Sequence, residues 1–78
     1  MWWWLEKIEE TGTAVTYGYG VATQNTTGRI RINKTDNSVT RLELADGDYE
    51  ALYQVFYRLV RHIIAKAGYP EVRSIATG

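Results

Sequence analysis

The chain has 78 residues, no cysteine, and nine acidic residues that balance nine basic ones. A chain of this length forms one domain, and without cysteine it has neither disulfides nor thiolate metal ligands. Its zero net charge lacks the positive excess typical of domains that bind nucleic acid or anionic membranes electrostatically. No stretch approaches the ~20 apolar residues that span a bilayer, and Glu6 and Lys7 interrupt the apolar start before it resembles a secretory signal. We expect one soluble, cytoplasmic domain over residues 1–78.

Four β-strands are expected in the first half of the chain, at about residues 2–9, 13–22, 28–34 and 39–44. In the second of these, large and small residues alternate strictly, so the row that begins at Val15 and contains both tyrosines of "YGYG" shares one face. We expect this row to face the core and the glycines to face away. The inverse arrangement, with the glycines under a helix, is the alternative.

The turn "ETG" between the first two strands predicts a hairpin with Gly12 in the left-handed conformation. A three-residue loop would place Trp2 and Trp4 across from the two glycines of "YGYG", and a two-residue loop would place Trp3 and Leu5 there. In both registers, at least one indole ring lies over a glycine and shields the backbone that the glycine leaves open.

The third and fourth strands flank "TDNS", which supplies turn residues. We predict a register in which Ile32 faces Leu42 and Ile30 faces Leu44. This register gives an apolar face and a charge-paired face together, and a slip of one residue would disrupt both.

A helix is expected at about residues 47–67, with Asp46 or Asp48 at its start and Gly68 at its end. Pro70 prevents its continuation. One stripe at helical spacing is expected to face the sheet: Leu52, Val55, Phe56, Leu59, Ile63 and Ala67.

Strands followed by a helix indicate an α+β fold. We expect a four-stranded antiparallel meander, packed on one face by a single long C-terminal helix. The tail, residues 69–78, is either a short fifth strand beside the first strand or a loose end.

Three consecutive tryptophans in a strand cannot all point into one core, because side chains alternate between the two faces of a sheet. The first strand would also be an uncharged outer edge, which invites pairing with another chain unless the tail covers it. The helix carries a surplus apolar flank beyond the stripe that one sheet needs. These features predict an interface: Trp2, Trp3, Trp4, Tyr53, Tyr57, Val60 and Ile64.

We therefore expect a small non-enzymatic interaction module that forms a homodimer or binds another protein. The sequence shows no nucleophile with an adjacent base, and His62, the lone histidine, reads as a solvent-facing helical residue. We expect neither a cofactor nor a metal.

Single-stranded nucleic-acid binding is the alternative, because cations near an aromatic ring on an open sheet suit phosphates and stacked bases. The residues that would carry it are Arg29, Arg31, Asn33 and Arg41. A third interpretation is a small-molecule site walled by the indoles.

Overall fold

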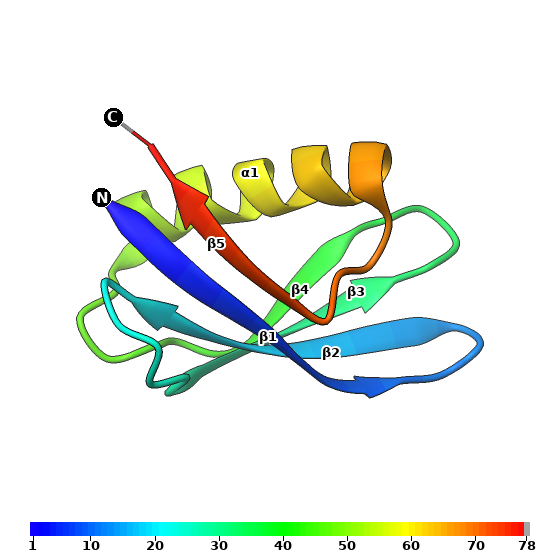
Figure 1. Cartoon of the computed structure of the whole chain (residues 1–78), viewed down its shortest axis with the longest axis horizontal. Coiled ribbons are helices and arrows are strands. Elements are labelled where there is room, and N and C mark those ends of the chain that lie inside the picture. Colours follow the sequence, from blue (N-terminus) through cyan, green and yellow to red (C-terminus); the bar gives the residue numbers. More distant parts are fainter. Residues whose placement is uncertain (78) are drawn as a thin grey trace.

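The computed structural model describes residues 1–77, and Gly78, the last residue of the expected domain and tail, lies outside this range. The expected α+β fold is confirmed: an antiparallel five-stranded sheet in the order β4-β3-β2-β1-β5 is covered on one face by one helix (Figure 1). The elements are β1 (Trp2–Glu10), β2 (Ala14–Val21), β3 (Gly28–Asn33), β4 (Val39–Glu43), α1 (Glu50–Ala67) and β5 (Val72–Ala76).

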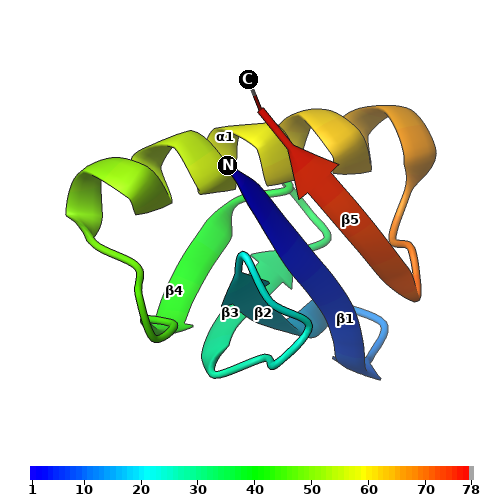
Figure 2. The ribbon, with the colours of Figure 1, turned by 60° about the vertical axis from the view of Figure 1, so that its left-hand side comes forward.

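The tail forms the fifth strand, and it lies antiparallel beside β1. Trp2 pairs with Ala76, and Glu6 pairs with Val72. Figure 2 shows the start of β1 and the end of β5 side by side. The edge of β1 is therefore covered within the chain, and β5 becomes the outer strand.

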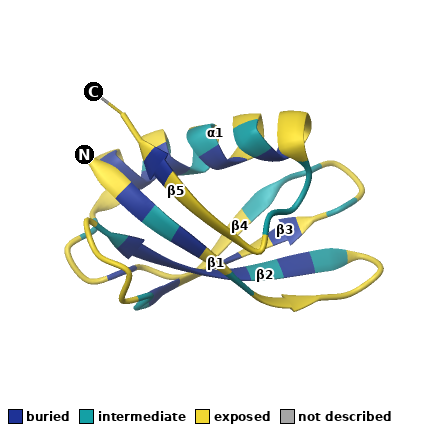
Figure 3. Ribbon diagram, in the orientation of Figure 1, coloured by how far each residue is buried: buried dark blue, intermediate teal, exposed yellow. Residues whose placement is uncertain are grey.

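The helix-facing side of the sheet forms the core, as Figure 3 shows by the dark blue segments beneath α1. Its central sheet residues are fully buried: Trp3, Leu5, Val15, Tyr17, Tyr19, Ile30 and Ile32. The tyrosines of "YGYG" thus face the helix and its glycines face away, as expected.

Both tyrosine hydroxyls of β2 hold the helix by its ends. The Tyr19 hydroxyl donates to Asp48 Oδ2 at 2.6 Å, just before α1, and the Tyr17 hydroxyl donates to the Pro70 carbonyl oxygen at 2.7 Å, just after it. Burial raises the pKa of Tyr17 to about 12, and burial and the bond to Asp48 also raise the pKa of Tyr19. Both phenols therefore stay protonated donors at neutral pH.

Residues 22–27, which connect β2 to β3, fold back over the two glycines of β2. A Cβ atom at Gly20 would lie 2.5 Å from the carbonyl oxygens of Thr23 and Asn25, and one at Gly18 would lie 3.0 Å from Thr26 Cβ. The close backbone approach requires glycine at position 20, whereas a side chain at position 18 would have to displace the Thr26 side chain slightly. The sequence predicts only an indole ring over a glycine on this face, whereas the 22–27 loop also covers it.

The hairpin of β1 and β2 differs from both expected registers. Trp4 pairs with Gly20, so one indole does lie opposite a glycine, but a bulge between Lys7 and Glu9 shifts the remaining pairs. Gly12 does not adopt a positive φ. The Thr11 hydroxyl oxygen instead accepts hydrogen bonds from the Thr13 and Ala14 amides, and these bonds close the turn.

The predicted register of β3 and β4 is wrong. Ile32 pairs with Val39 and Ile30 with Arg41, and Leu42 is the extra residue of a bulge. The bulge lets Arg41 reach over the helix-facing side, where Nη1 lies 2.7 Å from Glu50 Oε2 and the guanidinium lies 4.9 Å from the Tyr53 ring centre. Leu42 and Leu44, expected in the core, are exposed.

The helix begins at Glu50, three residues later than the expected boundary, with Tyr49 as an N-cap that makes no side-chain bond. Asp48 does not cap the helix, because its carboxylate accepts hydrogen bonds from the Tyr19 hydroxyl and the Tyr49 amide. The expected end is confirmed: Gly68 has a φ of 77° and its amide bonds to the Ile64 carbonyl oxygen.

The helix is rotated about its axis relative to the expected stripe. Leu52 and Phe56 are buried as expected, but Val55 and Ala67 are exposed, and Leu59 and Ile63 are half-buried. The buried face instead includes three residues of the expected surplus flank: Tyr53, Val60 and Ile64. Aromatic packing favours this orientation, since the Tyr53 ring lies 6.4 Å from the Tyr19 ring and 6.1 Å from the Phe56 ring.

We predict that Gly20→Ala destabilises the domain by about 1–3 kcal/mol, because its methyl group would collide with the backbone of residues 23–25. Gly12→Ala is the matched control. A Cβ atom there meets nothing within 4 Å, and we expect an unchanged or slightly increased stability, by up to about 1 kcal/mol. Urea unfolding followed by circular dichroism measures both, and equal effects of the two substitutions would contradict the close packing of the loop on β2.

Candidate interaction surface

The three tryptophans divide between the two faces of the sheet. Trp3 is fully buried beneath the helix, and within residues 1–77 its Nε1 has no hydrogen-bond partner. Trp2 and Trp4 point to the opposite face, where Trp2 keeps 37% of its surface exposed and Trp4 is half-buried. The expectation that the indoles occupy both faces is therefore met in the structure.

The outer face of β1 and β5 carries two further exposed apolar side chains, while Glu6 and Ser74 supply its polar groups. Ile8, the bulged residue of β1, is 56% exposed, and its Cδ1 lies on the same side as Gly18. Val72 of β5 pairs with Glu6, shares this face and is 50% exposed. We call Trp2, Trp4, Ile8 and Val72 the tryptophan face.

Small residues of β5 adjoin the large rings of β1. Trp2 lies opposite Ala76, and Trp4 lies opposite Ser74. The indole Nε1 of Trp4 donates to Glu6 Oε2 at 3.2 Å, which satisfies its polar atom at the surface. The two large indole rings on β1 thus lie beside two small side chains, Ala76 and Ser74, on β5.

The helix does not add to this surface. Tyr53, Val60 and Ile64 are buried against the sheet, and Tyr57, which stacks on Tyr53 at 5.9 Å between ring centres, is half-buried. Of the seven interface residues that the sequence predicts, only Trp2 and Trp4 lie on the outer sheet face. Ile8 and Val72 are not predicted from the sequence, since the β1 bulge and the side on which β5 presents Val72 depend on strand pairing.

The four residues of the nucleic-acid alternative do not share one surface. Arg29, Arg31 and Asn33 alternate with the buried isoleucines of β3 and are exposed on the outer face. Arg41 lies on the opposite side, paired with Glu50.

The remaining arginines are also separated from the indoles. Arg29 pairs across the sheet with Glu43, an acidic neighbour. The 22–27 loop covers Gly18 and Gly20 of β2, between β3 and the Trp4-bearing β1 (Figure 2). A base stacked on Trp4 would therefore not lie on a continuous path to the arginines of β3.

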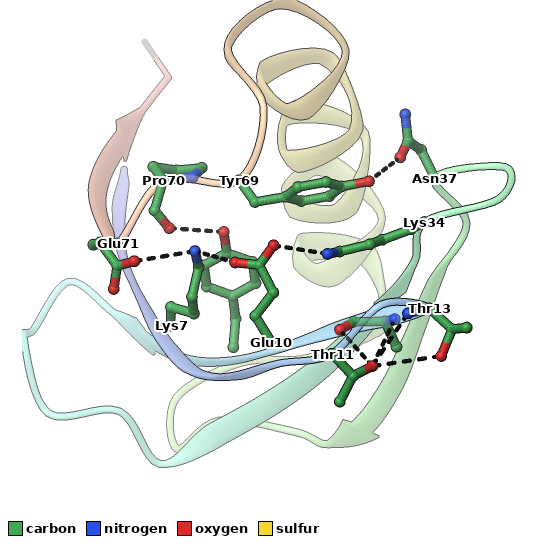
Figure 4. A network of polar contacts seen from close by, with 11 residues as sticks. Lys7, Glu10, Thr11, Thr13, Lys34, Asn37, Tyr69, Pro70 and Glu71 are labelled. Atoms are coloured by element: carbon green, nitrogen blue, oxygen red, sulfur yellow. Dashed lines mark hydrogen bonds and ion pairs between the residues drawn. The ribbon is translucent and has the colours of Figure 1, made fainter.

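A second cluster of polar side chains lies on the helix-facing side of the sheet, beyond the C-terminal end of α1 (Figure 4). Lys7 Nζ lies 2.6 Å from Glu10 Oε1 and 3.1 Å from Glu71 Oε1, and Lys34 Nζ lies 2.8 Å from Glu10 Oε2. Two cations and two carboxylates balance. The cluster links the hairpin end of β1 to the end of β3 and to the segment that leads into β5. Because every charge in it is paired, we interpret the cluster as a structural network and not as a binding site.

Within residues 1–77 we find no enclosed pocket and no group of three or more histidine, aspartate or glutamate residues placed to hold a metal ion. The described helix is too short or too polar to cross a bilayer. No protein-family model matches the chain, and neither a curated protein nor a solved structure matches it.

The network predicts an acid-dependent loss of stability. Hydrogen bonds from Lys34 and Lys7 lower the pKa of Glu10 from its ordinary 4.5 to about 2. A carboxyl group whose pKa is lowered by folding stabilises the fold above its ordinary pKa, and this stabilisation is lost as the pH falls through its folded pKa. We expect Glu10→Gln to be less stable than the parent at pH 7, and we expect this difference in stability to be much smaller at pH 2, where about half of Glu10 is protonated.

Urea unfolding at both pH values measures this difference. Glu9→Gln is the control, because Glu9 takes part in none of the ion pairs among residues 1–77. A stability gap between Glu10→Gln and the parent that is the same at pH 7 and pH 2 would contradict the ionic role of Glu10.

Proposed function

We propose that this domain is a non-enzymatic interaction module that forms a two-fold homodimer through the tryptophan face and the adjoining strand β5. The observation that carries the proposal is the exposure of Trp2, Ile8 and Val72 together on the outer face of one pair of strands. Exposed apolar groups gathered on one face mark association sites more often than single scattered ones do.

A second copy of the chain suits this surface because the surface is self-complementary. Rings on β1 stand beside small residues on β5, so a two-fold rotation can bring the rings of each copy towards the small residues of the other. The chain has zero net charge, so two copies do not repel each other.

Binding of single-stranded nucleic acid is the weaker candidate. The 22–27 loop separates Trp4 from Arg29, and Glu50 forms an ion pair with Arg41.

We propose that the protein acts in the cytoplasm, because a fold that is held together by its apolar core and contains no cysteine suits a reducing environment.

We predict that Trp2→Lys weakens the dimer by about tenfold or more, since each copy loses an apolar ring and gains a charge at the contact. Leu42→Lys is the matched control: Leu42 is 43% exposed but lies on β4, at the far edge of the sheet. The dimer of Leu42→Lys should have the same dissociation constant as the dimer of the parent. Sedimentation velocity across micromolar concentrations measures both variants.

A parent chain that sediments as a monomer throughout this range would refute self-association. A dimer weakened equally by both substitutions would move the contact away from the tryptophan face.

A further inference from the structure

The outer edge of β5 presents a regular row of unpaired backbone groups. The Lys7 amide bonds to the Glu71 carbonyl oxygen, and the Thr77 amide bonds to the Met1 carbonyl oxygen, at either end of the β1–β5 ladder. Bonding residues alternate along an antiparallel ladder, so Arg73 and Ile75 also direct their amides and carbonyls towards β1. The same groups of Val72, Ser74 and Ala76 point outwards.

Among residues 1–77, no other backbone segment takes up these outward groups, and β5 is the last strand of the sheet. Every residue of β5 except Ile75 is exposed. The strand contains no bulge and no proline, two of the devices that block pairing at an edge, and Arg73, on its helix-facing side, is its one charged residue.

The opposite edge of the sheet is different. The bulge at Leu42 interrupts β4, and Arg41 turns across the helix-facing side to pair with Glu50. A bulged strand is a poor template for another strand. Of the two sheet edges within residues 1–77, β5 is therefore the one with a regular ladder.

We propose that β5 pairs antiparallel with β5 of a second copy about a two-fold axis at Ser74, which joins two five-stranded sheets into one. This inference rests on the proposed self-association and specifies its geometry. Ser74 then faces Ser74 of the second copy, and Val72 faces Ala76 of the second copy.

This register is preferred for two physical reasons. It uses all the outward backbone groups of Val72, Ser74 and Ala76, whereas a shifted register leaves some unpaired. It also places each Arg73 opposite Ile75 of the second copy. A register centred one residue earlier would place the two Arg73 side chains directly opposite each other, and like charges in that position are destabilising.

The same register accounts for the exposed apolar groups beside the edge. Across the joined sheet, Trp2 is followed by Ala76 and then by Val72 of the second copy. Because Ala76 is small, the indole can lean across it towards this exposed valine. The contact occurs twice, once on each side of the axis, and both copies contribute the same residues.

Single cysteine variants test the axis cleanly, because the chain has no cysteine of its own. Facing residues of a hydrogen-bonded antiparallel pair have Cα atoms about 5.5 Å apart, within the range of a disulfide. We expect Ser74→Cys to form a covalent dimer on mild oxidation. Thr40→Cys, an exposed outer-face residue of β4, is the control and should remain largely uncrosslinked.

The register has its own test. Val72→Cys alone should not crosslink with itself, because its two copies would be about 14 Å apart. A mixture of Val72→Cys and Ala76→Cys should form the mixed disulfide. Crosslinking of Val72→Cys with itself as fast as Ser74→Cys would overturn the proposed axis.

A backbone substitution separates edge pairing from stacking of the two outer faces. Ser74→Pro removes an amide that β1 does not use, and edge strands tolerate proline. We expect Ser74→Pro to be a folded monomer by circular dichroism and sedimentation velocity, while Ser74→Ala, which keeps the amide, remains a dimer.

The outcomes distinguish the two proposals. A monomeric parent refutes self-association itself. A parent dimer that survives as Ser74→Pro, or that yields no faster crosslinking at Ser74→Cys than at Thr40→Cys, keeps self-association and overturns pairing through β5. Should Ser74→Pro unfold, the cysteine variants decide the question without it.

Discussion

Neighbouring residues of a β-strand point to opposite faces of a sheet, and a single helix covers only one of those faces. In β1 this constraint sends Trp3 into the core and Trp2 and Trp4 outwards. Burying an indole removes roughly 150–250 Å² from water, worth up to about 4–6 kcal/mol at ~25 cal/mol/Å². Such a term is comparable to the whole stability of a small domain, so Trp3 holds the register of β1, and that register fixes where the other two rings lie.

The "YGYG" segment of β2 extends the same constraint to the centre of the sheet. On the inner face, the hydroxyls of Tyr17 and Tyr19 bond to residues just after and just before α1, which fixes the helix at both ends. On the outer face, Gly18 and Gly20 admit the 22–27 loop. One alternating strand thus receives the helix on one side and a loop on the other. The outer face of β1 and β5 has no comparable cover among residues 1–77, and this asymmetry directs the proposed partner there.

Strand number, helix position and the inner face of β2 follow from alternation and helical spacing, which are local properties of the sequence. The errors arise where a contact distant in sequence outweighs a local pattern. Arg41 turns inwards because Glu50 and Tyr53 are there, which creates the bulge that exposes Leu42. The helix is rotated so that Tyr53 packs beside Tyr19 and Phe56, which buries the flank expected at the surface. Of the candidate surface, the outward indoles were predictable, whereas Ile8 and Val72 required the bulge and the β5 pairing.

The most direct measurement of the central claim is the solvent exchange of the three indole N–H protons by NMR, at a low and a high protein concentration. The account predicts that Trp3 exchanges slowly at both concentrations, that Trp2 exchanges fast in the dilute sample, and that Trp2 alone slows markedly when the protein is concentrated. Equal exchange of all three indoles would contradict their division between the two faces. An exchange rate of Trp2 that does not change with concentration, in a sample shown to be dimeric, would contradict its place at the contact.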